Sequence, residues 1–209
     1  KLDRPEVLVG HLGMSGQFLV QAKSAPDERH LRVKISLGRY DLRFIDQRTF
    51  GWLGVDETQN GLPTYVKDIA ADPFDPEFNL DETIERFRKK KTEIKRALLD
   101  QGVMSGVGNI YASESLFKAK VIPTRMAKDV SLNECKKIVK YIKETLHKAI
   151  ELGGSSLRDF YNVNGQSGYF QQTYAVYGRK GKPCRACKSI IESKIIAQRS
   201  SFYCPKCQT

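Results

Sequence analysis

The stretch GKPCRACKSIIESKIIAQRSSFYCPKCQT, residues 181–209, carries the strongest structural signal of the chain. Its cysteines follow the pattern Cys-x2-Cys-x16-Cys-x2-Cys, at Cys184, Cys187, Cys204 and Cys207. Each Cys-x-x-Cys pair is typical of a tight turn that aims two thiolates at one point, and two such turns make the tetrahedral sulfur shell that Zn2+ prefers. Four sulfurs leave no position for water, so we expect one structural Zn2+. Two disulfides or four unrelated thiols are the alternative.

Between the cysteine pairs, SIIESKIIAQRSSFY at residues 189–203 predicts a two-stranded hairpin held by the metal, a zinc ribbon. Residues 176–209 contain eight Lys or Arg against one acid, Glu192. The 209-residue chain has a net charge of +11, and most of it lies in residues 61–209, with 26 basic and 16 acidic groups. This charge favours a polyanionic partner, above all nucleic acid. A basic protein without such a partner is the alternative.

Neither an apolar stretch of 18 residues nor a lipidation signal is present, which disfavours a membrane partner. Four cysteines committed to metal leave Cys135, and this cysteine usage favours a reducing, cytoplasmic compartment. The chain begins at Lys1 without Met and runs directly into a strand-like segment. We therefore expect an N-terminal piece of the same domain to precede it.

Short apolar or alternating runs predict strands over residues 5–53, with a hairpin turn at GRYD, residues 38–41. Turn formers, with Pro73 and Pro76 among them, make residues 61–80 a candidate linker. A Gly- and Tyr-rich loop over residues 155–178 leads into the zinc ribbon. The order of these segments predicts separate β and helical regions, an α+β chain.

Helices are expected between the linker and this loop. The first runs from Asp81 to about Lys90, and the next begins with Thr92 as its N-terminal cap. Ser131 and Glu134 form a capping box for the longest helix. Its apolar positions fall on one face and predict core residues, namely Cys135, Ile138, Val139, Ile142, Leu146 and Ile150.

IKRALLDQGVMSGVGNIYASESLF, residues 94–117, joins two predicted helices through a Gly-rich turn. The N-terminus of the second helix, with Asn109 as its cap and Lys95 nearby, would offer donors and positive charge to a phosphate. The GVGN turn alone lacks the GK[ST] of a nucleotide-binding loop and suits a purely structural turn equally well. Beside a basic zinc ribbon, a clamp on the DNA backbone is the better interpretation.

Five motifs in the chain resemble those of bacterial formamidopyrimidine-DNA glycosylases, in the same order and over nearly the whole length. They are HLGMSG at 11–16, FIDQRTFG at 44–51, residues 94–117, VYGRKGKPCRAC at 176–187 and QRSSFYCPKCQ at 198–208. The resemblance implies an α+β fold with part of an N-terminal β-sandwich, a helix–two-turn–helix domain and a C-terminal four-cysteine zinc-ribbon hairpin. The implied boundaries are 1–60 for the sandwich part, 61–80 for the linker, 81–178 for the helical domain with a lesion-covering loop at 155–175, and 179–209 for the zinc finger.

The same resemblance implies a base-excision-repair glycosylase and AP lyase that removes oxidised purines such as 8-oxoguanine and formamidopyrimidines. Its partner would be double-stranded DNA with oxidised bases or abasic sites, bound by a monomer in the bacterial cytoplasm, at the nucleoid. A flipped base leaves a hole in the duplex that side chains must fill. The implied void-filling residues are Met14, Arg48 and Phe50, of which Arg48 would also hydrogen-bond the orphaned base and Phe50 would wedge into the step.

Further roles follow from the motif match. The implied DNA contacts are His11, His30, Arg48, Lys91, Lys95, Asn109, Tyr177 and Arg199. Arg199 is also associated with the second elimination step. The implied lesion loop is Asn164, Gly165, Gln166, Ser167, Gly168 and Tyr169.

In this family an N-terminal proline attacks C1′ of the sugar, and the resulting Schiff base permits β- and then δ-elimination. The proline and its Glu and Lys helpers match no residue of the chain, and Lys1 does not replace that lysine, because it lies too close to HLGMSG. We therefore expect these 209 residues to bind DNA without cleaving it. Two other functions stay open: an endonuclease VIII-type glycosylase of oxidised pyrimidines, and a non-catalytic zinc-ribbon module that binds nucleic acid.

Overall fold

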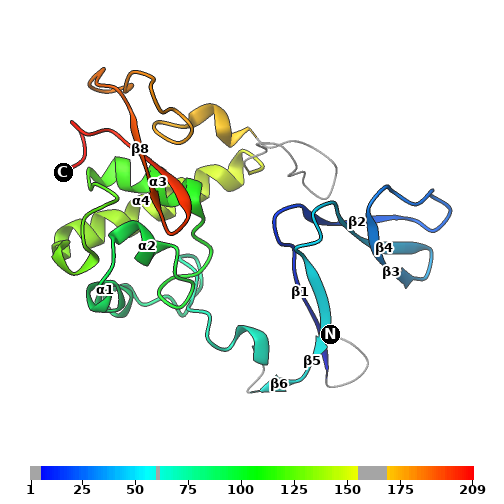
Figure 1. The fold of residues 1–209 in the computed structure, drawn as a ribbon. Coiled ribbons are helices and arrows are strands. Elements are labelled where there is room, and N and C mark those ends of the chain that lie inside the picture. The colour runs from blue at the N-terminus through cyan, green and yellow to red at the C-terminus, as the bar shows by residue number, and fades with distance from the viewer. Residues whose placement is uncertain (1–5, 60–61, 155–168) are drawn as a thin grey trace. The chain divides into compact units, whose positions relative to one another are not determined.

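The computed structural model describes residues 6–59, 62–154 and 169–209. They form two compact units, which are followed in Figure 1 by the colour of the chain. The first contains the described residues up to Lys67 and those between Leu152 and Gln171, and the second contains Asp68–Glu151 and Gln172–Thr209. Within these described ranges, no helix has both the length and the apolar character needed to cross a membrane.

The first unit is built of short antiparallel strands, as the alternating sequence predicted. They are β1 (Val7–His11), β2 (Gly16–Ala22), β3 (Leu31–Leu37), β4 (Tyr40–Asp46), β5 (Trp52–Asp56), β6 (Thr58–Gln59) and β7 (Leu62–Pro63). β1 pairs with β5, β4 lies between β2 and β3, and β6 pairs with β7. A hairpin turn was predicted at residues 38–41. Leu37 pairs with Tyr40, so the turn consists of Gly38 (φ +69°) and Arg39, and Tyr40 and Asp41 belong to β4.

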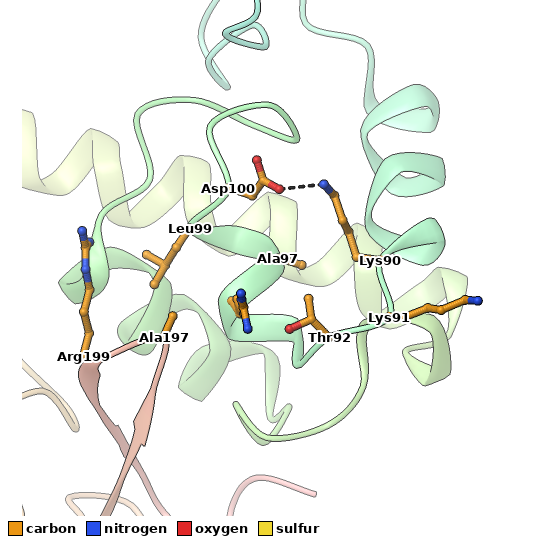
Figure 2. Close-up of a pocket in the computed structure, with 9 residues that line it drawn as sticks. Lys90, Lys91, Thr92, Ala97, Leu99, Asp100, Ala197 and Arg199 are labelled. Atoms are coloured by element: carbon orange, nitrogen blue, oxygen red, sulfur yellow. Dashed lines mark hydrogen bonds and ion pairs between the residues drawn. The ribbon is translucent and has the colours of Figure 1, made fainter.

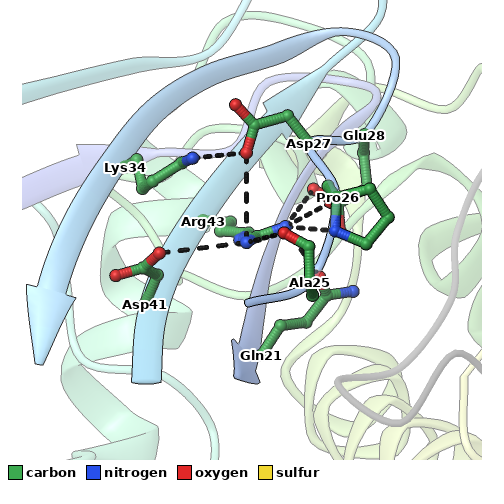
Figure 3. A network of polar contacts seen from close by, with 8 residues as sticks. All are labelled: Gln21, Ala25, Pro26, Asp27, Glu28, Lys34, Asp41 and Arg43. Atoms are coloured by element: carbon green, nitrogen blue, oxygen red, sulfur yellow. Dashed lines mark hydrogen bonds and ion pairs between the residues drawn. The ribbon is translucent and has the colours of Figure 1, made fainter. Parts of the chain in front are cut away.

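Arg43 lies fully buried in the central strand β4. Figure 3 shows its guanidinium facing the connection between β2 and β3. The guanidinium donates to the backbone carbonyls of Ala25 and Pro26 at 2.8 and 2.7 Å, and to the side chain of Gln21 at 2.9 Å. Glu28 adds an ion pair at 3.2 Å. One buried arginine thus supplies hydrogen-bond donors to two backbone carbonyls of this connection.

The second unit is helical and contains the larger core. Its helices are α1 (Leu80–Lys89), α2 (Ile94–Leu98), α3 (Asn109–Ala119) and α4 (Leu132–Glu151). The described residues also form three 3-10 turns, η1 (Thr64–Val66), η2 (Ala127–Asp129) and η3 (Phe170–Thr173). The apolar face of α4 packs with residues of α1, α2 and α3. The Ser131–Glu134 capping box is confirmed, because each backbone N–H bonds to the other residue's side chain, at 3.0 and 3.3 Å.

Two details of the prediction for α2 and α4 are wrong. Thr92 does not cap α2: Glu93 precedes the helix without a side-chain capping bond, since its backbone bridges to Met126 and keeps the segment extended. Ile150 is 70% exposed and lies off the apolar stripe, because Ala149 takes the buried position at that turn of α4. Cys135 is buried as expected, and burial raises the pKa of its thiol to about 11.

The predicted C-terminal hairpin is confirmed as β8 (Glu192–Ile196) and β9 (Arg199–Tyr203). Ile196 pairs with Arg199, which leaves Ala197 and Gln198 as the turn, both with positive φ (49° and 59°). This geometry matches the two-residue turn that follows the natural twist of a hairpin. A small apolar cluster joins the hairpin to helix α3 through Phe117.

Candidate nucleic-acid interface

The four predicted metal ligands converge at the base of the hairpin. The sulfur atoms of Cys184, Cys187, Cys204 and Cys207 all lie within 4.8 Å of one another. Around a Zn2+ ion with Zn–S bonds of about 2.3 Å, tetrahedral sulfurs would lie about 3.8 Å apart, so the cage has the size that the ion requires. The cage fits one structural zinc ion with a closed shell.

The other end of the hairpin is fastened to the helical core by two side chains. The backbone carbonyl of Ser200 accepts a hydrogen bond from Nζ of Lys95 at 3.3 Å and from Nδ2 of Asn109 at 3.2 Å. Lys95 also donates to the Ser201 hydroxyl at 2.8 Å. Because Ser200 follows Arg199, these bonds fix the backbone that carries the exposed Arg199 side chain.

Lys95 is placed differently from an exposed phosphate-binding lysine. Its side chain is fully buried between α2 and the hairpin. Burial, and then the neighbouring Arg199 cation, lower the pKa of the Lys95 ammonium to about 7. The arrangement gives Lys95 a direct part in holding the hairpin tip, whereas the sequence had suggested an open cation.

Asn109 is the first residue of α3 and not its cap, which corrects the prediction. Gly108 is the N-cap, and it offers no side chain to the helix N-terminus. The Asn109 amide instead donates to the Tyr177 hydroxyl at 3.3 Å and to Ser200. Since the Tyr177 hydroxyl accepts this bond, its own proton is available to an outside acceptor such as a phosphate oxygen.

Tyr177 is held in turn by a buried carboxylate that the sequence did not reveal. Glu114 of α3 is 4% exposed and accepts three backbone hydrogen bonds, from Ala175 at 2.8 Å, Val176 at 3.0 Å and Tyr177 at 2.8 Å. Three successive N–H groups bound to one carboxylate fix the segment that leads into the zinc ribbon. Asn109, Tyr177 and Arg199 are thereby gathered at the N-terminal end of α3.

A cavity of about 600 Å3 opens beside this group (Figure 2). Its lining combines α2 and the segment before it with the hairpin tip, and consists of Lys90, Lys91, Thr92, Arg96, Ala97, Leu99, Asp100, Ala197 and Arg199. Four cations face a single acid, Asp100, which pairs with Lys90 at 2.6 Å. In Figure 2 the Lys91 side chain extends away from Arg199. The excess positive charge suits an anionic ligand.

Four candidates lie in the first unit, on the loops at residues 11–16 and 46–51, namely His11, Met14, Arg48 and Phe50. Nδ1 of His11 accepts a hydrogen bond from the Gly13 backbone at 3.0 Å, so a neutral imidazole carries its proton on Nε2, free to donate. Met14 and Phe50 are 67% and 58% exposed, which is unusual for large apolar side chains. The guanidinium of Arg48 lies 5.1 Å from the centre of the Phe50 ring.

Two further candidates are less informative. His30 lies at a positive φ of 71°, and its backbone carbonyl accepts a hydrogen bond from Asp46. In the candidate lesion loop, Asn164, Gly165, Gln166, Ser167 and Gly168 lie outside the described residues. Tyr169 is exposed, and its backbone N–H donates to Leu152 at 2.9 Å.

Sequence models of three domains match the chain: the formamidopyrimidine-DNA glycosylase N-terminal domain at residues 1–53, the formamidopyrimidine-DNA glycosylase H2TH domain at 69–161, and the zinc finger found in FPG and IleRS at 181–209. A formamidopyrimidine-DNA glycosylase of Salinispora tropica is 46% identical over 210 residues, which cover 99% of this chain and 73% of that protein. The chain belongs to the formamidopyrimidine-DNA glycosylase family.

Solved structures of the family cover nearly the whole chain. The complex of Lactococcus lactis Fpg with DNA containing an abasic site is 33% identical, with a TM-score of 0.87 over 98% of this chain and 75% of that one. The complex of the same Fpg with DNA containing Fapy-dG is 32% identical, with a TM-score of 0.86 and the same coverage. The fold prediction is confirmed: part of a β-sandwich, a helix–two-turn–helix domain and a zinc-ribbon hairpin.

The motifs shared with the family did not reveal the buried side chains that hold the candidate site together. These are Glu114, Ser201 and Asp46, all buried. Glu114 stands among small and apolar residues of a predicted helix, and an acid in such a position is the one signal that could have identified it. Nothing in the sequence separates Asp46 from the exposed acids of the chain.

Proposed function

We propose that the chain serves base-excision repair of DNA as part of a glycosylase and AP lyase for oxidised purines, such as 8-oxoguanine and formamidopyrimidines. Its family membership supports this function, and its structural relatives hold DNA with an abasic site or Fapy-dG. The observation that carries the proposal is the fastening of the zinc-held hairpin tip at Ser200 to α2 and α3. It places Arg199 beside a basic cavity, where a phosphodiester backbone would bind.

The second unit would grip the DNA backbone. Phosphate oxygens would accept hydrogen bonds from the Tyr177 hydroxyl and the Arg199 guanidinium at the N-terminal end of α3, where the helix dipole adds to the attraction. Asn109 would orient Tyr177, and Lys91 would add charge at the rim of the cavity. Lys95 would contribute indirectly, because its hydrogen bond to the Ser200 carbonyl holds the backbone beside Arg199. None of these contacts depends on base sequence, as lesion search along a duplex requires.

The first unit would replace the flipped base. Met14 and Phe50 would enter the space left in the duplex, and Arg48 would donate to the base left without a partner. His11 would donate to a phosphate through Nε2. On the family resemblance, His30 would be a further phosphate contact, and residues 164–169 would form the loop that covers the flipped purine.

The bond-making amine of the family, an N-terminal proline, matches no residue of this chain. We propose that the 209 residues supply DNA binding, base flipping and the Arg199 cation of the second elimination step, and that alone they bind without cleaving. The zinc ion is structural: it shapes the hairpin and takes no part in bond making. DNA as substrate would place the protein at the bacterial nucleoid.

Borohydride trapping tests the proposed function. The protein as its gene encodes it, and the 209-residue chain beside it, are incubated with duplexes that carry 8-oxoguanine opposite cytosine or dihydrouracil. A covalent adduct of the gene-encoded protein, formed preferentially with 8-oxoguanine, would support the proposal. Preference for dihydrouracil would indicate an endonuclease VIII-type enzyme, and binding without any adduct would indicate a non-catalytic module.

A further inference from the structure

Asp46, the last residue of β4, is 1% exposed. It forms hydrogen bonds with both loops that carry the candidate void-filling residues Met14, Arg48 and Phe50, which we call the wedge residues. Oδ1 accepts hydrogen bonds from the Ser15 hydroxyl at 2.6 Å and from the Arg48 backbone at 3.2 Å. Oδ2 accepts one from the Gly51 backbone at 2.8 Å. These bonds, led by the one from Ser15, lower the pKa of the Asp46 carboxyl. One carboxylate therefore joins loop 11–16 to loop 46–51.

The two loops also touch directly, backbone against backbone. A Cβ atom on Gly13 would lie 2.7 Å from the carbonyl carbon of Phe50, and Gly13 has a positive φ of 64°. A Cβ atom on Gly51 would lie 3.0 Å from the carbonyl oxygen of His11. The two glycines permit an approach that no other residue would allow without displacement. The Ser15 hydroxyl closes the contact by accepting from the Arg48 backbone at 3.0 Å.

The three wedge side chains project from this joint. Met14 precedes Ser15, whose hydroxyl is held by Asp46, and Arg48 and Phe50 lie between the two backbone groups that Asp46 binds. Arg48 and Phe50 stack on each other, and Thr49 between them has a positive φ of 57°. Hydrogen bonds to one buried carboxylate thus fix the backbone beside the exposed side chains. Such preorganisation lowers the ordering cost at the moment of binding.

We propose that Asp46 is a positioning residue, which locks the loops of Met14, Arg48 and Phe50 into one preformed wedge that enters the DNA as a unit. The inference rests on the proposed role of these three side chains in filling the void. A carboxylate that only stabilised the sheet would affect every kind of DNA binding equally. A carboxylate that shapes the wedge would affect damaged DNA in particular.

The test compares Asp46→Asn with Asp56→Asn in the full chain. Asp56 is a matched control: its carboxylate also binds a hydroxyl and a backbone N–H, of Thr64 at 2.7 Å and Tyr65 at 3.2 Å, in a turn of the same unit without wedge residues. Affinities are measured for an undamaged duplex and for one with a tetrahydrofuran abasic site. A 2-aminopurine base opposite that site reports by fluorescence how the void is filled.

Asp46→Asn should lower the preference for the abasic duplex about tenfold and weaken the fluorescence response, while the affinity for undamaged duplex stays as in the wild type. Asp56→Asn should change neither. A normal preference and fluorescence response in Asp46→Asn would overturn the inference, as would an equal loss on both duplexes.

The proposed function is tested separately in the same experiment. A wild-type chain without preference for the abasic duplex would contradict the proposed void filling itself. Loss of preference in Phe50→Ala, with Asp46→Asn unchanged, would contradict only the role of Asp46. If Asp46→Asn does not fold, as judged by circular dichroism and thermal unfolding, Ser15→Ala takes its place. Ser15→Ala removes the hydrogen bonds of the Ser15 hydroxyl to Asp46 and to the Arg48 backbone, and it leaves the Asp46 carboxylate on Gly51. A several-fold loss of preference supports the inference, and an unchanged preference overturns it.

Discussion

Glu114 holds Tyr177 by its main chain: Oε1 of Glu114 lies 2.8 Å from the Tyr177 backbone nitrogen. The same carboxylate bonds the two preceding N–H groups, so the approach to the zinc ribbon is fixed from within α3. The Tyr177 ring then packs edge-on against Phe202 of β9, 5.0 Å between ring centres. A buried residue of helix α3 therefore determines the position of Tyr177, whose hydroxyl is a candidate hydrogen-bond donor to a phosphate.

Glu114→Gln should destabilise the chain by about 2–3 kcal/mol, because the amide replaces a charged acceptor of buried N–H groups and brings a competing donor. Urea unfolding measures the change. Glu85→Gln is the control, since Glu85 forms an exposed pair with Lys89 on α1, and loss of such a pair should leave the free energy of unfolding nearly unchanged. Equal effects of the two variants would contradict the anchoring role of Glu114.

Lys95 should make stability depend on pH. The Lys95 pKa falls from an ordinary 10.5 to about 7 in the folded chain, so between these values the unfolded chain binds a proton that the folded chain does not. The free energy of unfolding should therefore rise with pH from about 7 towards 10, by at most about 1.4 kcal/mol per pH unit. Below pH 7 both states are protonated, and this contribution is flat.

Lys95→Met should remove that rise, whereas Lys140→Met, on the exposed side of α4, should keep it. Chemical unfolding at a series of pH values measures both. The same slope in Lys95→Met as in the wild type would show that Lys95 is not the titrating group.

Removal of zinc should release the hairpin and abolish tight DNA binding, because the small apolar cluster around the cysteines is too limited to hold the turns alone. Cys204→Ser should contain less than one zinc per chain and bind DNA at least tenfold more weakly. Cys135→Ala, which changes a buried cysteine outside the cage, should retain one zinc ion. Metal analysis together with a DNA titration measures both effects. Full DNA affinity of the zinc-free protein would contradict the predicted dependence of DNA binding on zinc.

Arg199→Ala should weaken DNA binding and reduce the slope of log K against log salt by about one, the value for one lost phosphate contact. Arg185→Ala is matched in charge and lies exposed within the first cysteine pair, away from the cavity. Its slope should stay near that of the wild type. Identical slopes for the two variants would assign Arg199 no special phosphate contact.

The sequence predicted the elements whose signals are local. Cysteine spacing indicated the zinc ribbon, alternating residues indicated strands β1 to β4, and Ser131 with Glu134 indicated the start of α4. Each of these features depends on residues close together in the chain. The fold could therefore be predicted in outline, with errors at single residues such as Thr92 and Ile150, where tertiary contacts decide.

The candidate site was predictable only at its surface. The resemblance to the family's motifs indicated exposed residues such as Met14 and Phe50, because residue type and spacing alone identify them in those motifs. It did not show that Lys95 is buried, since burial of its ammonium depends on a hairpin more than 100 residues later in the chain. The roles of Glu114 and Asp46 were not predicted for a similar physical reason. Both carboxylates bind backbone N–H groups, which residue type does not mark, and the hydroxyl that Asp46 also binds belongs to Ser15, 31 residues earlier in the chain.

The turn of the zinc hairpin has a consequence for how this sequence can vary. Ala197 and Gln198 both hold positive φ, where glycine or asparagine would be less strained by about 1 kcal/mol per residue. The turn tolerates this strain because the metal at one end and the bonds to Ser200 at the other already fix the strands. Glycine or asparagine at position 197 or 198 would therefore make the hairpin more stable without a change in the pairing of β8 with β9. The turn can accept such substitutions, because the contacts that fix its two ends involve the side chain of neither residue.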